Sequence, residues 1–232
     1  MQRTLVPLLL APVGFIALAV LGSAFGWLVV HTIQSADFAI VQTAVAHRSA
    51  ALTPLMHRFS DLGGEITVIV ILAVALLALL LARRWIDALA VLGATVGSLY
   101  LYEFIVRWVG RHRPPVPHLE NPGGSSFPSG HVANSTALYL AILLAVFVFA
   151  RRRSLRVALL LLALALVTAI AVSRIYLGLH YPSDIVAGFL IGVAWARRVR
   201  AARRGAGAPA QRRRTARPAG PAEPQAVGRG AR

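Results

Sequence analysis

Six apolar stretches, each long enough or almost long enough to cross a lipid bilayer, constrain this chain more than any other feature. A helix needs about 20 apolar residues to span the hydrocarbon core, with a tolerance of a few residues for tilt and for arginine stems that reach the interface. Apolar residues make up 57% of the 232 residues, well above the usual share in soluble proteins. We therefore predict an all-α polytopic membrane protein with six transmembrane helices in a bundle. The stretches run from about Leu5 to Val30, Ile66 to Ala82, Ile86 to Val106, Val132 to Ala150, Val157 to Val172 and Ile185 to Ala196.

The placement of arginine predicts how the bundle is oriented. Six spans put both termini on one side of the membrane, and the side richer in Lys and Arg is the cytoplasmic one. Twelve arginines flank the spans on the side of the termini, against six on the other side, and the chain has no lysine. We expect cytoplasmic termini. The Arg- and Ala-rich composition is typical of a GC-rich bacterial genome, so the expected location is a bacterial inner (plasma) membrane.

The first stretch also allows a second interpretation, a cleaved signal peptide. Its apolar run greatly exceeds the h-region of about 7 to 15 residues that signal peptides carry, and no clear A-x-A site follows it. A transmembrane span is therefore the favoured interpretation.

The chain divides into three parts by composition. Residues 1–45 hold the first span and the start of an outer loop, residues 46–196 hold the other five spans, and residues 197–232 form a basic tail. The tail contains eleven arginines and one glutamate and has almost nothing to bury, which predicts a disordered cytoplasmic segment. We expect it to bind anionic lipid head groups rather than nucleic acid, because no aromatic residue is interleaved with the arginines.

Two patterns indicate how the spans pack. Apolar residues from Leu52 to Phe59 recur at the spacing of an amphipathic helix, which lies on the outer surface or packs as an ordinary loop helix. Gly93 and Gly97 in the third span are four residues apart, a spacing typical of closely packed membrane helices.

The absence of cysteine excludes disulfides and thiolate metal sites.

Three polar segments stand at the predicted outer ends of the spans: GRHRP at 110–114, FPSGH at 127–131 and SRIYLGLHYPSD at 173–184. A helical bundle can bring them together. Arg113 and Arg174 carry permanent charge and forked donors that suit phosphate oxygens. Ser129 stands where the fourth span begins, so backbone N–H groups and the helix dipole can face an anion there. These residue types predict a phosphate-binding pocket on the outer face.

Two histidines and an aspartate add groups that can break a phosphate ester. His180 and Asp184 are four residues apart and share a face if the last helix begins there. A carboxylate on one imidazole nitrogen leaves the other free as a nucleophile, and His131 can protonate the leaving oxygen. Arg111 is interpreted as an interface anchor or a charge behind the site, and Ser183 as a residue that shapes the start of the last helix.

The RP pair at 113–114, PSGH at 128–131 and S-R-x5-H-x3-D from Ser173 to Asp184 resemble the three-part signature of the type 2 phosphatidic acid phosphatase superfamily. That superfamily includes membrane lipid phosphate phosphatases and vanadium haloperoxidases. The resemblance covers roughly residues 50 to 196. It implies a six-helix membrane enzyme with an outer-face site, a phosphohistidine intermediate and no metal or other cofactor. It assigns His180 as nucleophile, Asp184 as its orienting partner, His131 as general acid, and Arg113, Ser129, the Gly130 backbone and Arg174 to the phosphoryl oxygens.

One position departs from the family pattern. The lysine that the family has seven residues before the arginine of the RP pair is Val106 here. Arg107 is adjacent, but one residue is about 100° around a regular helix. Either the helix unwinds near its end so that Arg107 binds phosphate, or this contact is missing. We favour the first alternative, because the chain uses arginine for every cation.

Three functions follow as alternatives. The favoured one is a membrane phosphatase that hydrolyses a lipid phosphate or a polyprenyl diphosphate. The second is a non-catalytic lipid-phosphate-binding or transport protein, and Val106 favours it. The third places zinc on His131, His180 and Asp184, although the adjacent arginines would repel a dication. Phosphatidic acid, phosphatidylglycerophosphate and undecaprenyl diphosphate all fit the predicted pocket.

Overall fold

The computed structural model describes residues 2–121, 123–147 and 149–207. Within these residues the chain forms eight helices and no strand, which confirms the all-α prediction. Most connections between the helices are short. The longest runs from Gly110 to Ser129 and carries part of the polar cluster described below. The helices are α1 (Gln2–Thr32), α2 (Gln34–Ala46), α3 (Thr53–Asp61), α4 (Glu65–Leu81), α5 (Trp85–Val109), α6 (Gly130–Val146), α7 (Arg153–Tyr176) and α8 (Pro182–Gly207).

Three of the described helices are long and apolar enough to cross a membrane by themselves. They are α5, α7 and the part of α1 from Pro12 to Thr32, and α3 with α4 makes a fourth span if this pair, bent by 44°, is counted as one. The helix α6 has 17 residues, and α8 ends in an arginine-rich segment. The chain is thus a multi-pass membrane protein, while the count of six spans stays a prediction.

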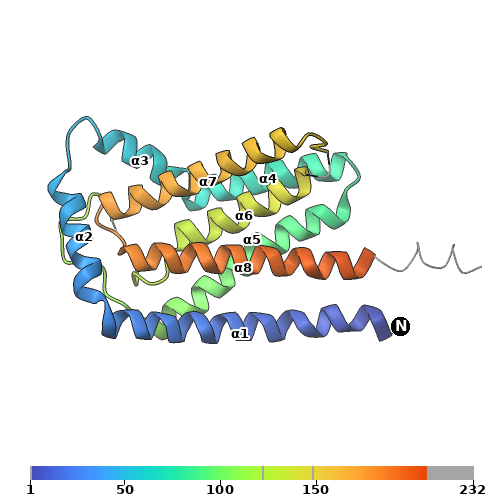
Figure 1. The fold of residues 1–232 in the computed structure, drawn as a ribbon, viewed down its shortest axis with the longest axis horizontal. Coiled ribbons are helices and arrows are strands. Elements are labelled where there is room, and N and C mark those ends of the chain that lie inside the picture. The colour runs from blue at the N-terminus through green and yellow to red at the C-terminus, as the bar shows by residue number, and fades with distance from the viewer. Residues whose placement is uncertain (1, 122, 148, 208–232) are drawn as a thin grey trace, which may run out of the picture.

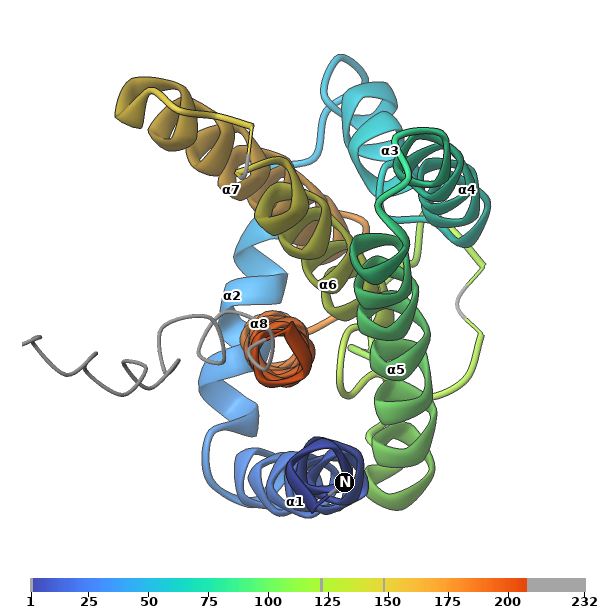
Figure 2. The ribbon, with the colours of Figure 1, turned by 90° about the vertical axis from the view of Figure 1, so that its right-hand side faces the viewer.

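The long helices lie side by side, and α8 lies between α6 and α1 (Figures 1 and 2). It packs against α6, α1 and α5. Its Ile191 and Trp195 join an apolar cluster with Leu101 and Ile105 of α5. At one end of the bundle α2 crosses over the ends of the long helices, and α3 packs against α7.

Glycines allow α8 to approach its neighbours closely. A Cβ atom on Gly188 would lie 2.6 Å from the carbonyl oxygen of Ser129, and one on Gly192 would lie 2.6 Å from that of Ala133. Both glycines therefore face α6, one helical turn apart. On α5, a Cβ atom on Gly97 would collide with the Trp195 ring, which confirms the close packing predicted there. The Gly188 and Gly192 pair has the same four-residue spacing but was not predicted.

Two helix boundaries differ from the sequence prediction. The helix α2 follows α1 after a single residue and was not predicted, whereas α3 confirms the amphipathic helix expected from Leu52 to Phe59. The last helix continues to Gly207, beyond the predicted end at Ala196, so residues 197–207 are helical rather than part of a disordered tail. Residues 208–232, the rest of that tail, lie outside the described residues.

Candidate active site

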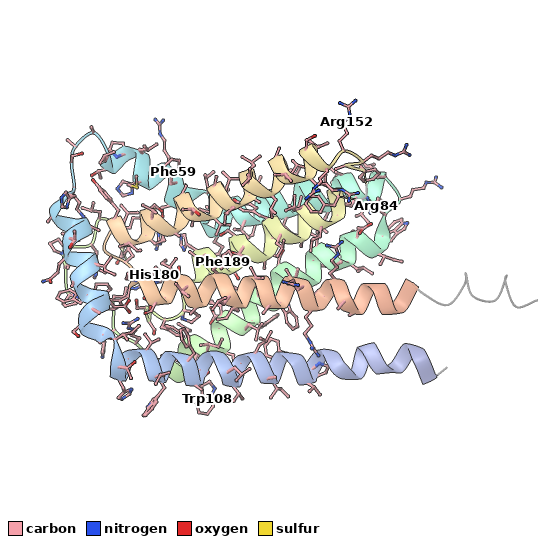
Figure 3. The ribbon with its side chains drawn as sticks, viewed as in Figure 1. Phe59, Arg84, Trp108, Arg152, His180 and Phe189 are labelled. Carbon is pink, nitrogen blue, oxygen red and sulfur yellow. The ribbon has the colours of Figure 1, made fainter. Side chains whose placement is uncertain are left out.

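The three polar segments meet at one end of the bundle. Figure 3 shows His180 at the end of the bundle where α2 lies, while Arg84 and Arg152 lie at the opposite end. Backbone contacts hold the segments together: Ser129 N donates to the carbonyl of Asp184 at 3.0 Å. The Arg113 guanidinium donates to the carbonyl of Leu179 at 2.7 Å, which ties the loop after α5 to the turn before α8. The loop, the start of α6 and the start of α8 thus share one layer.

The imidazole of His180 is fixed by a backbone carbonyl. His180 is only 2% exposed, and its Nδ1 lies 2.7 Å from the carbonyl oxygen of Ser126. Because a carbonyl only accepts, Nδ1 carries the hydrogen, and this assignment leaves the Nε2 lone pair free. Nε2 lies 3.4 Å from Nη1 of Arg113. The free nitrogen therefore faces a cation that suits phosphate.

The predicted partner of His180, Asp184, acts at a longer distance than expected. Its Oδ2 lies 3.6 Å from His180 Nδ1, beyond hydrogen-bond range. Burial lowers the pKa of His180 below its ordinary value, and the negative charge of Asp184 opposes that change. The imidazole is consequently neutral at physiological pH, which is the form that a nucleophile needs.

The Asp184 carboxylate is held by three donors. Oδ1 accepts from Nη1 of Arg111 at 2.6 Å, and Oδ2 accepts from Oγ of Ser126 at 2.5 Å and from the backbone N–H of Tyr181 at 2.8 Å. In the last contact, the side chain of Asp184 accepts a hydrogen bond from the backbone of Tyr181, the residue before the helix. This contact is one half of a capping box. Pro182 at the first helical position also favours a helix start there. The sequence therefore fixes both the start of α8 and the position of Asp184.

A buried guanidinium behind Asp184 completes this network. Arg111 also pairs with Asp37 of α2, with 2.8 Å between Nη2 and Oδ2, and it donates to Gln34 and Ser183. Its guanidinium carbon lies 3.8 Å from the centroid of the Tyr181 ring. Of the two sequence interpretations, the structure supports a charge behind the site. Sequence reasoning missed Asp37, although an acidic residue in an apolar segment is a sign of a buried ion pair in a membrane protein.

Two polar atoms of the predicted phosphate site lack a partner. Oγ of Ser129 and Nε of Arg174 are buried and make no hydrogen bond within the described part of the chain. Ser129 precedes the first residue of α6, yet its side chain does not cap that helix. Buried polar atoms are almost always hydrogen-bonded, so both atoms are available to a ligand that brings an acceptor.

The remaining predicted residues lie around these two atoms. Nη1 of Arg174 donates to Oε2 of Glu120 at 2.7 Å and to Oγ of Ser60 at 2.6 Å, and these contacts hold the guanidinium in place. Gly130 begins α6, where backbone N–H groups have no intrahelical acceptor. Burial, and after it the charges of Arg174, His180 and Arg113, lower the pKa of His131, the next residue, to about 3, so its imidazole is neutral before an anion enters the site. The cluster therefore combines two imidazoles with donors that suit a tetrahedral anion.

Arg107 is not brought into this cluster. Its side chain is 77% exposed and lies 3.5 Å from Glu103, one turn earlier on α5. The helix remains regular through Val109, so it does not unwind to turn Arg107 inward. Val106 is half-buried and brings no charge to the site. The favoured prediction, that Arg107 replaces the family lysine at the phosphate site, is therefore wrong: the regular helix directs Arg107 away from the cluster, and the lysine contact has no counterpart there.

A comparison with protein families decides the membership of the chain. The profile of the PAP2 superfamily matches residues 87–206, which is more than half of the sequence and includes all three polar segments. The chain belongs to the PAP2 superfamily. The resemblance predicted from the three motifs is thereby confirmed, and several curated relatives are named as phosphatases of lipid phosphates.

Curated PAP2 relatives include enzymes from two kinds of bacteria. Phosphatidylglycerophosphatase B of Bacillus subtilis is 28% identical over 169 residues, which is 71% of this chain and 82% of that protein. Decaprenylphosphoryl-5-phosphoribose phosphatase of Mycobacterium tuberculosis is 35% identical over 114 residues, or 47% of this chain and 56% of that protein. The crystal structure of a transmembrane PAP2 type phosphatidylglycerolphosphate phosphatase from Bacillus subtilis superposes with a TM-score of 0.71 at 25% identity, covering 87% of this chain and 96% of that one.

Proposed function

We propose that this protein is a metal-independent phosphatase that hydrolyses a lipid phosphate monoester or a polyprenyl diphosphate through a phosphohistidine on His180. One observation carries the proposal: the Ser126 carbonyl holds Nδ1 of His180, so Nε2 is free and faces Arg113. This is the arrangement that an imidazole nucleophile requires.

The proposed reaction has two displacements. The anionic phosphate of the bound substrate would raise the lowered pKa of His131, so that His131 is protonated in the complex. His180 Nε2 attacks phosphorus, a nitrogen–phosphorus bond forms, and the bond from phosphorus to the lipid oxygen breaks as His131 gives that oxygen a proton. Water then attacks the phosphohistidine while His131 takes a proton from it, which releases inorganic phosphate and restores both histidines. The phosphoryl oxygens gain charge in each transition state, and donors fixed in advance stabilise that charge. The donors are Arg113, Ser129, the Gly130 backbone and Arg174.

The charges of the site favour a mechanism without a metal. Both oxygens of Asp184 already accept hydrogen bonds, from Arg111, Ser126 and Tyr181. A dication on His131 and His180 would also stand beside Arg113 and Arg174 and be repelled by them. These contacts support the assignment of both histidines to phosphoryl transfer rather than to zinc.

An apolar cavity supports a lipid as the substrate. The cavity, of about 600 Å³, lies between α6, α7 and α8. Thr136, Val167 and Phe189 line the part nearer the site, and Arg197 and Arg200 of α8 line the part farther from it. Thr136 is five residues beyond His131, about 8 Å along the helix axis. Figure 3 shows Phe189 part-way along the bundle from His180. A lipid chain in this cavity would place its phosphate near the histidines.

We further propose that six spans cross the inner membrane, with both termini in the cytoplasm and the site on the outer face. The arginine distribution supports this orientation, because Arg84 and Arg152 lie at the end of the bundle opposite His180 (Figure 3). The arginines of the tail would then contact the anionic lipids of the cytoplasmic leaflet.

A non-catalytic protein that binds or transports a lipid phosphate is the second candidate, because Val106 and the outward Arg107 leave one cation fewer at the site than the family pattern has. Phosphate release by the purified protein separates the two functions. The substrates are phosphatidic acid, phosphatidylglycerophosphate and undecaprenyl diphosphate in detergent, each with excess chelator. The matched variants are His180→Ala and His31→Ala, which alters an exposed histidine.

Release that survives the chelator, is lost in His180→Ala and persists in His31→Ala supports the phosphatase. A folded protein that binds these lipids but releases no phosphate from any of them supports the second candidate. Comparison of the three rates identifies the preferred substrate.

A further inference from the structure

Tyr102 lies on α5 beside the phosphate site. It precedes Val106 by four residues, so the two side chains share one face of the helix. That face is half-buried at both positions, whereas Tyr100, two residues earlier, is 64% exposed. The face on which the family places a lysine therefore carries a phenol in this chain, one turn away.

The ring of Tyr102 is in contact with the start of α6. A Cβ atom on Gly130 would lie 2.9 Å from Cε2 of Tyr102 and 3.0 Å from Cζ, the carbon that bears the hydroxyl. Any side chain at position 130 would thus meet the hydroxyl-bearing edge of the ring. The close approach places this edge next to Ser129, whose Oγ lacks a partner.

The hydroxyl of Tyr102 lies within range of the charges of the phosphate site and has no acceptor of its own. The charge of Glu103, the next residue on α5, acts on it most, followed by those of Arg113 and Arg174, the two arginines of the phosphate site. Within the part of the chain that the structure describes, the hydroxyl makes no hydrogen bond. An O–H group near both arginines can donate to the anion that those arginines bind.

We propose that the Tyr102 hydroxyl donates a hydrogen bond to the phosphoryl group of the substrate and supplies the contact that Val106 cannot make. This inference rests on the proposed function, since it adds a phosphate-binding residue to the same site. It explains how a chain without the family lysine retains a complete set of donors. It also gives a reason for glycine at position 130, where a side chain would push the phenol away.

The test compares Tyr102→Phe with Tyr100→Phe, a matched change on the exposed face of the same helix. Binding of orthovanadate, a phosphate analogue, is measured by equilibrium dialysis in detergent, together with phosphate release. A hydrogen bond to a charged group is worth enough to change affinity by about 10- to 100-fold. We expect Tyr102→Phe to raise the vanadate Kd by that factor with an unchanged melting temperature, and Tyr100→Phe to leave Kd unchanged.

A rescue variant separates a phosphate contact from a packing effect. Val106→Lys in the Tyr102→Phe background should restore most of the lost affinity, because the ammonium stands on the same helix face; Val106→Leu should not. An unchanged Kd in Tyr102→Phe, an equal loss in Tyr100→Phe, or a wild-type protein that does not bind vanadate would overturn the inference. A protein that binds vanadate through Tyr102 yet releases no phosphate would support the inference and refute the phosphatase proposal.

Discussion

Arg111 donates to Asp184 with 2.6 Å between Nη1 and Oδ1, and the same guanidinium lies 2.8 Å from Asp37 through Nη2. One buried cation therefore joins α2 to the first turn of α8. All three side chains are buried, so each charge depends on the others for compensation. Asp184 in turn receives the hydroxyl of Ser126, the residue whose carbonyl holds His180.

Removal of this cation should destabilise the fold. Arg111→Ala leaves two buried carboxylates without a counter-charge, and we expect the free energy of unfolding to fall by about 3–5 kcal/mol. Arg111→Lys should lose less, since a single ammonium keeps the charge but not the fork that reaches both carboxylates. Denaturant titration in detergent measures both. Arg107→Ala is the control, because that side chain is exposed and its ion pair contributes little. Equal stability of Arg111→Ala and Arg107→Ala would contradict the network.

The close approach of α8 to α6 predicts a second effect on stability. Gly188→Ala would place a methyl group 2.6 Å from the Ser129 carbonyl, so the two helices must separate at the phosphate site. We expect a loss of about 1–3 kcal/mol, as for other overpacked interiors, together with reduced phosphate release. Gly93→Ala is the matched control, since its new methyl group would meet only Val199, at 4.0 Å. A Gly188→Ala protein as stable and active as Gly93→Ala would refute the packing argument.

The protonation of His180 predicts the acid side of the pH profile. The nucleophile must be neutral, and burial lowers its pKa below the ordinary value of 6.5. Protonation of the nucleophile should therefore reduce kcat/KM only below pH 6.5. Arg113 also lowers this pKa, so Arg113→Gln should move the acid limb to higher pH as well as reduce the maximum. An acid limb centred above 6.5 in the unaltered protein would contradict a neutral, buried nucleophile.

The absence of cysteine allows a direct test of the orientation. Asn121→Cys places a thiol in the exposed part of the loop near the site, and Arg152→Cys places one at the opposite end of the bundle. A membrane-impermeant maleimide added to intact spheroplasts should label Asn121→Cys alone. Labelling of Arg152→Cys should require permeabilised membranes. The reverse pattern would place the site in the cytoplasm.

The sequence predicted the helical class and the cluster of polar segments because both depend on local patterns. Runs of apolar residues predict helices in a membrane, and motifs at the ends of consecutive helices must meet when those helices pack antiparallel. The start of α8 was also readable, from Pro182 and from the capping position of Asp184. These features need no knowledge of distant contacts.

Contacts between distant segments could not be predicted from the sequence. The contact of the Ser126 carbonyl with His180 and the pairing of Arg111 with Asp37 depend on loop conformations and on α2, whose apolar residues do not follow the periodicity of an amphipathic helix. The direction of Arg107 depended on whether α5 stays regular to its end, and it does. Every residue has a backbone carbonyl, so the sequence does not indicate which carbonyl contacts a histidine.

The central claim is that His180 becomes covalently phosphorylated. The most direct measurement is a rapid quench with denaturant and alkali during the first turnover of phosphatidic acid radiolabelled in its phosphate, followed by detection of label on the protein. A nitrogen–phosphorus bond survives alkali and is cleaved by acid. We predict an alkali-stable, acid-labile label on the unaltered protein and on His31→Ala, and none on His180→Ala. Phosphate release by the unaltered protein with no such label at any time, or an undiminished label on His180→Ala, would contradict the account.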